Sequence, residues 1–450
     1  MKGKTPRAIS LELLDRIEKT DRHLDLLLSE AFKRYRHLTP RDRAFLTELA
    51  YGVLRWKGRL DWVIHRYADL SFEKIEPRVL HILRLGLYQI LFLTRTPVSA
   101  AVNESVELAK KIRGKGGASF VNAILRRVAR EKDSIAYPSI EADPAAYGAV
   151  VESYPEWAVR RWIAQWGVEK TLLFCREMNR IASLTLRTNT LRISRDTLIQ
   201  RLREKGLSPV ATTFSEEGIL LEDAPPVSEL PFLGEGLYVI QDEASQLVCQ
   251  VLDPKPGEII LDACAAPGGK RTHMAQRMRN EGGIYALDVT KEKLKRVREA
   301  TERLGITIVK TLWGDAAKPL PVKADLVFDR VLADVPCSGY GTLRKNPDLK
   351  WRRQKEDIER LARLQLSILQ NISRYVKAEG ILVYSTCTVF REENEDVVET
   401  FLRQKPEFQL EPVSLVQGRL KDLSSGNYLK TFPESRGMDG FFVARLKKRS

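Results

Sequence analysis

Apolar residues recur at helical spacing throughout the first 133 residues of the chain. They lie three or four positions apart at Phe45, Leu46, Leu49, Val53 and Leu54, at Val79, Leu80, Leu83, Leu87 and Ile90, at Val102, Val106 and Ala109, and at Val121, Ile124, Leu125 and Val128. Thr5 and Thr39 each precede a proline, which joins a capping hydroxyl to a residue suited to the first helical turn. We therefore predict an all-α domain over residues 1–133.

The pattern changes between residues 134 and 235. Pro138 and Pro144 follow Tyr and Asp and mark a linker. Residues 184–193 then alternate as a strand does, with one side formed by Leu184, Leu186, Thr188 and Thr190. A helix is predicted over 196–205 and a strand over 218–221. We expect a linker followed by a small α+β module.

From residue 236 to residue 450, short apolar strands alternate with helices. The strands are predicted at EIILDA (258–263), GGIYALDV (282–289), ITIVKTLWGD (306–315), DRVLADV (329–335) and GILVYSTC (380–387). This rhythm is typical of a mostly parallel sheet with helices on both faces. We predict a C-terminal α/β domain with a Rossmann-like sheet, in which the last apolar stretch, DGFFVARL (439–446), is an edge strand.

The charge of the chain narrows the class of partner. A net charge of +15 over 450 residues favours an anionic partner, and nucleic acid is the commonest one. Two basic clusters flank a predicted turn at Gly116-Gly117: Lys110, Lys111, Arg113 and Lys115, then Arg126, Arg127 and Arg130. They are either a solvated face or a surface that meets phosphates. Arg187, Asn189 and Arg192 are further candidates for RNA contact.

Other classes of protein are disfavoured. The longest apolar candidate, residues 83–93, is shorter than the about 18 residues that a transmembrane helix needs. The first ten residues have no apolar core behind their charges, unlike a signal peptide. The five cysteines form no CxxC pair, so neither a disulfide framework nor a metal site is indicated. We expect a cytoplasmic protein that binds no metal and no membrane.

A ligand-binding loop is predicted after the first C-terminal strand. Residues 261–270 leave that strand and enter a helix, and their small residues let the backbone approach a ligand closely. Asp288, at the end of the second strand, can accept hydrogen bonds from ribose hydroxyls, and Asp315, after the third, can read an adenine amino group. A phosphate-binding P-loop is excluded by Cys264 and Arg271. S-adenosylmethionine suits this arrangement.

Two cysteines follow the next two strands and indicate the chemistry. Cys337 follows the fourth strand and Cys387 ends the fifth, so both lie at the carboxyl edge where ligands bind. Carbon 5 of cytosine becomes nucleophilic when a thiolate adds to carbon 6 and ring nitrogen 3 is protonated or held by an acid. Asp334 is placed for the second role, and Lys270 can hold its carboxylate and help to depress a cysteine pKa. These residues leave open which cysteine attacks.

The motifs DACAAPGGK (262–270), DVPCSG (334–339) and YSTC (384–387) resemble the signature of RNA cytosine-5 methyltransferases. The helical N-terminus resembles the RNA-binding fold of the antitermination protein NusB. The domain order, and the segment from Gly236 to Ser245, resemble the Sun/Fmu (RsmB) family of bacterial ribosomal RNA methyltransferases across nearly the whole chain.

This resemblance implies roles for the candidate residues. It implies that Cys387 is the nucleophile and that Cys337 assists release, as or with the general base. The residues it implies around S-adenosylmethionine are Cys264, Ala265, Ala266, Pro267, Gly268, Gly269, Lys270, Asp288, Asp315 and Asp334.

The resulting hypothesis is a monomeric enzyme with three parts: a NusB-like helical RNA-binding domain (1–133), a linker with an α+β module (134–235) and a class I methyltransferase domain (236–450). It would methylate carbon 5 of a cytidine in small-subunit (16S) ribosomal RNA, either free or at an early stage of assembly. One alternative is an RNA-binding ribosome assembly factor with an inactive methyltransferase fold. Another is a DNA cytosine methyltransferase. By resemblance, the second cysteine, Cys387, and the NusB-like domain both favour an RNA enzyme over this alternative.

Overall fold

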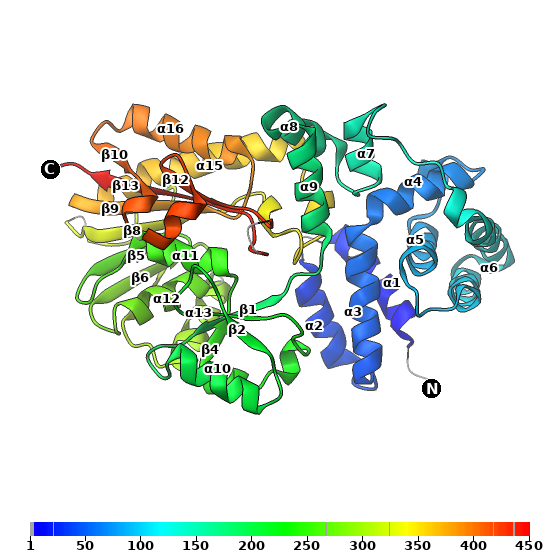
Figure 1. The fold of residues 1–450 in the computed structure, drawn as a ribbon, viewed down its shortest axis with the longest axis horizontal. Helices are drawn as coiled ribbons and strands as arrows, with labels where there is room; N and C mark the ends of the chain where they lie inside the picture. The colour runs from blue at the N-terminus through cyan, green and yellow to red at the C-terminus, as the bar shows by residue number, and fades with distance from the viewer. Residues whose placement is uncertain (1–3, 21, 266–267, 324, 417, 435–436) are drawn as a thin grey trace. The chain divides into compact units, whose positions relative to one another are not determined.

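The computed structural model describes residues 4–20, 22–265, 268–323, 325–416, 418–434 and 437–450. The chain divides into two compact units, each with its own core (Figure 1). The first unit contains residues up to Arg180 together with Leu343–Arg352, and the second contains Ile181–Thr342 and Arg353–Ser450. Within the described ranges, no helix has the length and apolar character needed to cross a membrane.

The first unit is helical. The sequence predicted helices over residues 1–133, and the unit extends beyond that range to Arg180, into residues assigned to the linker and α+β module. Thr5 caps α1 by accepting a hydrogen bond from the Ala8 amide, and Thr39 forms a capping box with Asp42 at the start of α3. The helices are α1 (Pro6–Lys19), α2 (Leu24–Arg34), α3 (Pro40–Arg55), α4 (Lys57–Tyr67), α5 (Pro77–Phe92), α6 (Val98–Glu131), α7 (Pro144–Val150), α8 (Glu156–Trp166), α9 (Val168–Asn179) and α14 (Leu349–Arg352).

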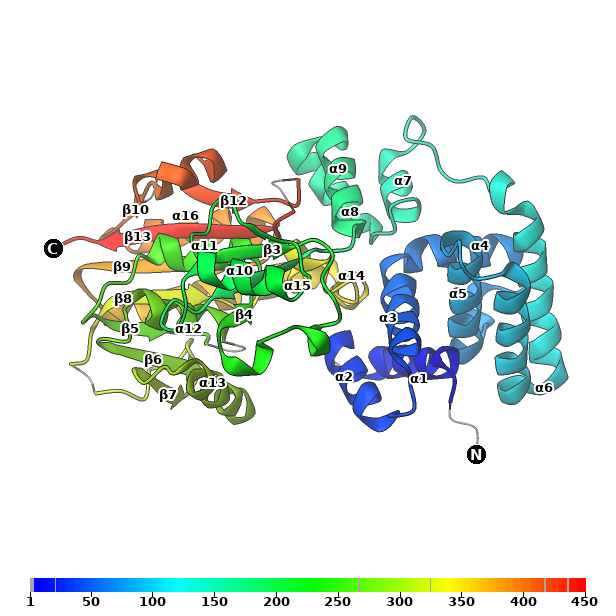
Figure 2. The ribbon, with the colours of Figure 1, turned by 60° about the horizontal axis from the view of Figure 1, so that its bottom comes forward.

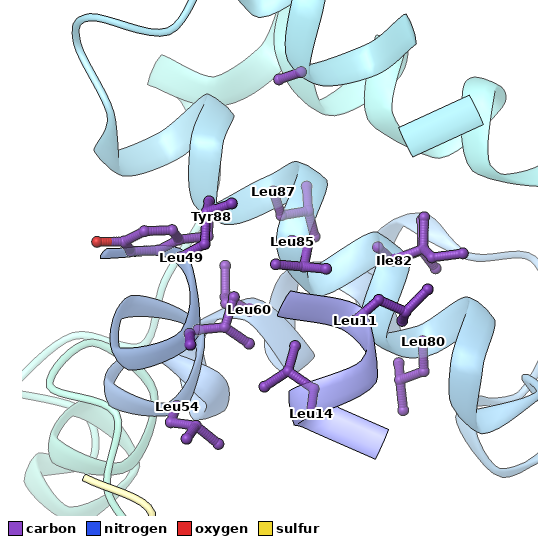
Figure 3. Packing of buried hydrophobic residues seen from close by; sticks show 14 of the residues in the cluster. Leu11, Leu14, Leu49, Leu54, Leu60, Leu80, Ile82, Leu85, Leu87 and Tyr88 are labelled. Atoms are coloured by element: carbon purple, nitrogen blue, oxygen red, sulfur yellow. The ribbon is translucent and has the colours of Figure 1, made fainter. Parts of the chain in front are cut away.

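Helix α5 lies at the centre of this unit, because nearly all of its side chains are buried. Figure 3 shows Leu80, Ile82, Leu85 and Leu87 of α5 packed near leucines of α1, α3 and α4. The turn predicted at Gly116-Gly117 is wrong: α6 is interrupted at Gly114, which has φ 64° and ψ −154°. A glycine adopts this backbone conformation without the steric cost that a Cβ would add.

The segment Leu343–Arg352 packs within the first unit, although its neighbours in sequence lie in the second. The Lys350 side chain is 0% exposed, and its Nζ donates to the carbonyl oxygens of Arg55 (3.2 Å) and Ser153 (3.1 Å) and to Oδ1 of Asn179 (2.7 Å). The Trp351 indole donates to the carbonyl oxygen of Leu54 at 2.6 Å. Burial lowers the pKa of Lys350 well below its ordinary value, and its Nζ group, with three acceptors, fixes this segment within the unit.

The second unit contains a small antiparallel sheet and a larger mixed sheet. The small sheet has the order β2-β3-β1-β4. Its strands are β1 (Leu184–Thr188), β2 (Pro209–Ala211), β3 (Gly218–Leu221) and β4 (Tyr238–Ile240), and α10 (Arg195–Glu204) packs on it. The strand over 218–221 and the helix near 196–205 were both expected from the sequence.

The larger sheet has the order β11-β12-β13-β9-β8-β5-β6-β7, with β10 also paired to β13. Its strands are β5 (Ile259–Asp262), β6 (Gly283–Asp288), β7 (Val309–Trp313), β8 (Phe328–Asp334), β9 (Val376–Thr386), β10 (Phe408–Glu411), β11 (Ser424–Ser425), β12 (Tyr428–Thr431) and β13 (Phe441–Lys448). Strands β5 to β9 are parallel. The prediction of an edge strand over 439–446 is wrong, because β13 lies between β9 and β12 and pairs with both.

Helices cover both faces of this sheet (Figure 2). Alternate strand residues face opposite layers: Ile260 packs with the core under α11, α12 and α13, whereas Leu261 packs with the core under α15 and α16. These helices are α11 (Glu243–Leu252), α12 (Gly269–Arg277), α13 (Lys291–Leu304), α15 (Lys355–Ile372) and α16 (Glu395–Gln404). The parallel strands therefore end together at one edge, where loops can gather functional side chains.

Candidate active site

The loop between β5 and α12 is shaped by glycine. Gly268 has φ 124°, and a Cβ at this position would lie 2.1 Å from Nη2 of Arg271. Gly269 begins α12, so Lys270 stands in the first helical turn. Two predicted cofactor residues, Ala266 and Pro267, lie outside the described residues. The local backbone therefore requires glycine at position 268.

Two predicted acids lie at the same edge of the sheet. Oδ1 of Asp288, at the end of β6, accepts a hydrogen bond from the Thr290 amide (3.0 Å), and Oδ1 of Asp315, after β7, accepts one from the Ala317 amide (2.9 Å). These local bonds orient each carboxylate. Cys264 lies among the charges of the loop: its pKa is raised well above the ordinary value by burial and then by Asp262, Asp334, Asp288 and Asp315.

Asp262 is a site residue that the sequence analysis missed. It ends β5, is 2% exposed, and its Oδ1 accepts no hydrogen bond within the described part of the chain. Burial raises its pKa to about 7, against the opposing charge of Arg271. A buried acceptor of this kind fits an ammonium group, such as that of S-adenosylmethionine. The signal was available, because Asp262 ends its strand just as Asp288 does.

The two candidate cysteines meet after β8 and β9. The sulfurs of Cys337 and Cys387 are 3.4 Å apart, and both residues are partly exposed. The pKa of Cys337 is raised well above its ordinary value, first by its hydrogen bond with Cys387 and then by burial. The sequence analysis expected Lys270 to help depress the pKa of one cysteine without saying which, and at Cys337 the pKa is raised instead. A Cys337 that keeps its proton can donate it to the sulfur of Cys387.

An ion pair stands beside the cysteines. Nζ of Lys270 lies 2.7 Å from Oδ2 of Asp334, and the Ser385 hydroxyl donates to Oδ1 at 2.8 Å. Burial lowers the pKa of Lys270, but the charge of Asp334, its hydrogen bond and Cys387 outweigh burial and raise it. The lysine therefore stays charged and holds the Asp334 carboxylate in place.

A buried carboxylate links the loops of the two cysteines. Oε1 of Glu393 accepts hydrogen bonds from the Ser338 amide (2.8 Å) and from Nε2 of Gln365 (3.0 Å). The Ser338 hydroxyl also bonds to Oγ1 of Thr388 at 2.7 Å. Ser338 follows Cys337 and Thr388 follows Cys387, so this network fixes both loops. The sequence analysis did not find Glu393, because only the fold brings it into contact with the loop that carries Cys337.

Gly341 joins the same loops through backbone bonds. Its amide donates to the carbonyl oxygen of Cys387 at 2.9 Å, and its carbonyl oxygen accepts from the Gly440 amide at 2.7 Å. A Cβ on Gly341 would lie 1.8 Å from the Gly440 oxygen. The close approach of these three segments therefore depends on glycine at position 341.

Of the three residues of the middle module predicted to contact RNA, only Arg192 is exposed. Arg187 and Asn189 are buried, so their assignment to RNA contact is wrong. Their side chains bind protein atoms instead: Arg187 donates to the Gly269 carbonyl oxygen at 2.6 Å, and Asn189 to that of Gly236 at 2.8 Å. Arg192 is exposed.

The basic clusters of the first unit do lie at the surface. Their exposed residues are Lys110, Lys111, Arg113, Lys115, Arg126, Arg127 and Arg130. Part of the charge is compensated, since Arg113 pairs with Glu76 and Arg127 lies 3.5 Å from Glu131. The arrangement leaves positive groups on both sides of Gly114 that can approach phosphates.

Three family profiles match successive parts of the chain. A profile for 16S rRNA methyltransferase RsmB/F matches residues 249–447. A profile for the NusB family matches residues 4–130, and one for the ferredoxin-like domain of RsmF/B-like methyltransferases matches residues 154–228. The predicted fold class is thus confirmed: a NusB-like helical domain, a small α+β module and a methyltransferase domain.

Individual relatives match along all or most of their length. The chain is 40% identical to a protein of Bacillus subtilis called "Probable ribosomal RNA small subunit methyltransferase B", with 100% of both chains covered. It is 34% identical to "Ribosomal RNA small subunit methyltransferase B" of Pseudomonas syringae pv. tomato, over 91% of this chain and 90% of that one. The crystal structure of PH0851 is similar with a TM-score of 0.83 and 29% identity, over 99% of both chains. The chain therefore belongs to the RsmB/F family of 16S rRNA methyltransferases.

Proposed function

We propose that this chain transfers a methyl group from S-adenosylmethionine to carbon 5 of a cytidine in 16S ribosomal RNA, through a covalent bond between Cys387 and the base. The observation that carries the proposal is the pair of cysteine sulfurs 3.4 Å apart, beside the Lys270–Asp334 ion pair. Names of relatives supply the ribosomal RNA of the small subunit as the substrate class. The cytosine and the covalent step are argued from the site.

S-adenosylmethionine supplies an electrophilic methyl group on its sulfonium. Asp262 would hold its ammonium, because a buried carboxylate oxygen there has no other partner within the described residues. Asp288 and Asp315 would bind the ribose and the adenine, and the loop that includes Cys264, Ala265, Ala266, Pro267, Gly268, Gly269 and Lys270 would line the ligand together with Asp334.

Cys387 is assigned the attack on the base. Its thiolate would form a bond to carbon 6, and the electron pair of the 5,6 double bond would make carbon 5 nucleophilic. This assignment follows the resemblance of the YSTC motif (384–387) to that of RNA cytosine-5 methyltransferases, and the sulfur of Cys337 lies within hydrogen-bond distance of Cys387, at 3.4 Å. Once ring nitrogen 3 has taken up a proton from water, Asp334, held by Lys270 and Ser385, would accept a hydrogen bond from its N–H and stabilise that protonated state.

Cys337 is assigned to product release. After methyl transfer, the proton on carbon 5 must leave, and the bond from carbon 6 to Cys387 must break with its electron pair returning to sulfur. Cys337 would assist this step in one of two ways. Its S–H, 3.4 Å from the sulfur of Cys387, would hydrogen-bond to the departing thiolate beside another base, or Cys337 would first give up its own proton and then act as the base itself.

The cysteine assignment is tested by single substitutions incubated with labelled S-adenosylmethionine and 16S ribosomal RNA. Cys387→Ala should transfer no methyl group and form no adduct. Cys337→Ala should attack and methylate but retain the product, which gives an RNA–protein band on denaturing gels. Cys175→Ala, which removes a buried cysteine of the first unit, is the matched control and should turn over.

Two outcomes would count against the proposal. If the trapped band appears with Cys387→Ala and not with Cys337→Ala, the two roles are reversed. If the wild-type protein labels no cytidine at carbon 5, the reaction is wrong. A second comparison, of naked RNA with partly assembled small subunits, tests our expectation that free or early-assembly RNA is methylated.

A further inference from the structure

Arg187 belongs to β1, and its buried, charged side chain contacts the start of α12, the helix that follows the predicted cofactor loop. Its side chain is 0% exposed. Nη1 donates to Oε1 of Gln241 and to the carbonyl oxygen of Gly269 (2.6 Å). Nη2 donates to Oγ1 of Thr272 (2.8 Å), and Nε donates to Oε1 of Gln276 (3.1 Å). A planar guanidinium can satisfy acceptors in fixed directions in a way that a lysine cannot.

The acceptors of Arg187 define the first turns of one helix. Gly269 is the first residue of α12, and Thr272 and Gln276 follow on the side that faces β1. The Thr272 hydroxyl also donates to the Gly269 carbonyl oxygen at 2.9 Å, so two donors meet on that oxygen. Lys270, the next residue, reaches Asp334 from this turn. Arg187 therefore bonds to the turn in which the loop ends and α12 starts, and Lys270 extends from that same turn.

Further bonds dock the same helix on the small module. Nε2 of Gln276 donates to the carbonyl oxygen of Thr188 at 2.7 Å, which makes its contact with β1 reciprocal. Arg277 of α12 donates to Oε1 of Glu217, just before β3, at 3.0 Å. His273, which lies 3.5 Å from Oε1 of Glu217, is 0% exposed, and burial lowers its pKa to about 4. The small module thus supports α12 along its length.

We propose that Arg187 is a positioning residue for the methyl donor, and that the small α+β module is part of the cofactor site. The guanidinium sets the turn at Gly269, and this turn sets both the glycine loop and the reach of Lys270 to Asp334. The inference rests on the proposed use of S-adenosylmethionine. It replaces the sequence-based expectation that Arg187 touches RNA.

The test measures the affinity for S-adenosylhomocysteine by calorimetry and the affinity for RNA by filter binding. Arg187→Met should weaken cofactor binding about tenfold or more, as the loss of a residue that orients ligand contacts does. Arg187→Lys should restore part of it, because one or two of the bonds can reform. Thr272→Val removes one acceptor without a change of shape and should give a smaller loss. All three variants should keep wild-type RNA affinity.

Two controls separate positioning from a general loss of stability. Gln246→Leu removes another buried polar side chain of this region, which bonds to Leu186 and Gln241 backbone oxygens and not to α12. When the Gln246→Leu and Arg187→Met proteins are compared at equal thermal midpoints, Gln246→Leu should have the higher cofactor affinity. Arg192→Ala, an exposed arginine of the same module, should bind the cofactor normally.

Each result decides between the ideas. Equal cofactor affinity in wild type and Arg187→Met, or an equal loss in Gln246→Leu at the same midpoint, would overturn the inference. Loss of RNA affinity alone in Arg187→Met would restore the RNA-contact interpretation. Absence of cofactor binding by the wild-type protein would instead refute the proposed function.

Discussion

Replacement of Gly341 by alanine tests whether the three backbone segments at the cysteines must stay in contact. The new Cβ would lie 1.8 Å from the Gly440 oxygen and 2.9 Å from the Cys387 oxygen. Because real Cβ atoms do not approach other atoms within 3.0 Å, the Gly440 segment must retreat by about 1.2 Å. That shift would break the 2.7 Å bond to Gly440 and strain the 2.9 Å bond to Cys387.

The expected cost is larger for catalysis than for stability. Loss of two ordinary hydrogen bonds costs about 2 kcal/mol, which a domain with a stability of about 5–15 kcal/mol survives. A displacement of about 1 Å between reacting groups lowers the rate by about a hundredfold. We therefore expect Gly341→Ala to remain folded and to bind the cofactor normally, while methyl transfer in a single turnover falls by about two orders of magnitude.

The assay follows the first-turnover rate, the amount of covalent RNA adduct and the thermal midpoint of the same preparation. Gly283→Ala is the matched control, because a Cβ at Gly283 of β6 meets no atom within 4 Å. It should react at the wild-type rate. A folded Gly341→Ala protein that also reacts at the wild-type rate would refute the reasoning, since the cysteines would then not depend on this contact.

Three other variants give separable outcomes. Asp288→Ala should weaken S-adenosylmethionine binding about 10–100-fold in calorimetry, as loss of a hydrogen bond to a charged group does, with RNA affinity unchanged; unchanged cofactor affinity would contradict its role. Replacement of Arg126, Arg127 and Arg130 by alanine should weaken RNA binding and flatten its salt dependence by roughly two units of logarithmic slope, and an unaltered slope would argue against phosphate contact. Burial raises the pKa of Asp262 from 3.8 to about 7, so the folded protein retains a proton that the unfolded chain has released, and stability falls as pH rises through this range. Asp262→Asn should abolish that fall in cofactor-free protein, and thermal midpoints that still decline with pH would exclude Asp262 as its source.

Residues that follow parallel strands were predictable. Lys270, Asp334, Cys337 and Cys387 all lie at the carboxyl edge of the large sheet, as the strand pattern indicated. Their grouping follows from one rule, that parallel strands end at the same edge. The sequence could not give the separation of the sulfurs or the bonds that hold each loop, because these depend on the packing of segments far apart in the chain.

Residues whose environment depends on neighbouring elements were not predictable. The alternation of residues 184–193 indicates which side chains share a face, but not whether another element covers that face. Arg187 was therefore assigned to RNA, although α12 buries it. The same limit applies to β13, whose pattern is equally compatible with an edge strand and with its observed place between β9 and β12. Strand order is set by long-range pairing, which leaves little trace in the local pattern.

The position of Leu343–Arg352 within the first unit has a consequence for synthesis on the ribosome. The acceptors of Lys350, on Arg55, Ser153 and Asn179, emerge long before Lys350 itself. At a synthesis rate of about 5–20 residues per second, roughly 10–30 s pass between the addition of Arg180 and the addition of Arg352. During that interval the first unit lacks the segment Leu343–Arg352. It cannot reach its final structure until β8 and the residues after Cys337 have been synthesised. A fragment that ends at Arg180 would remain in this incomplete state.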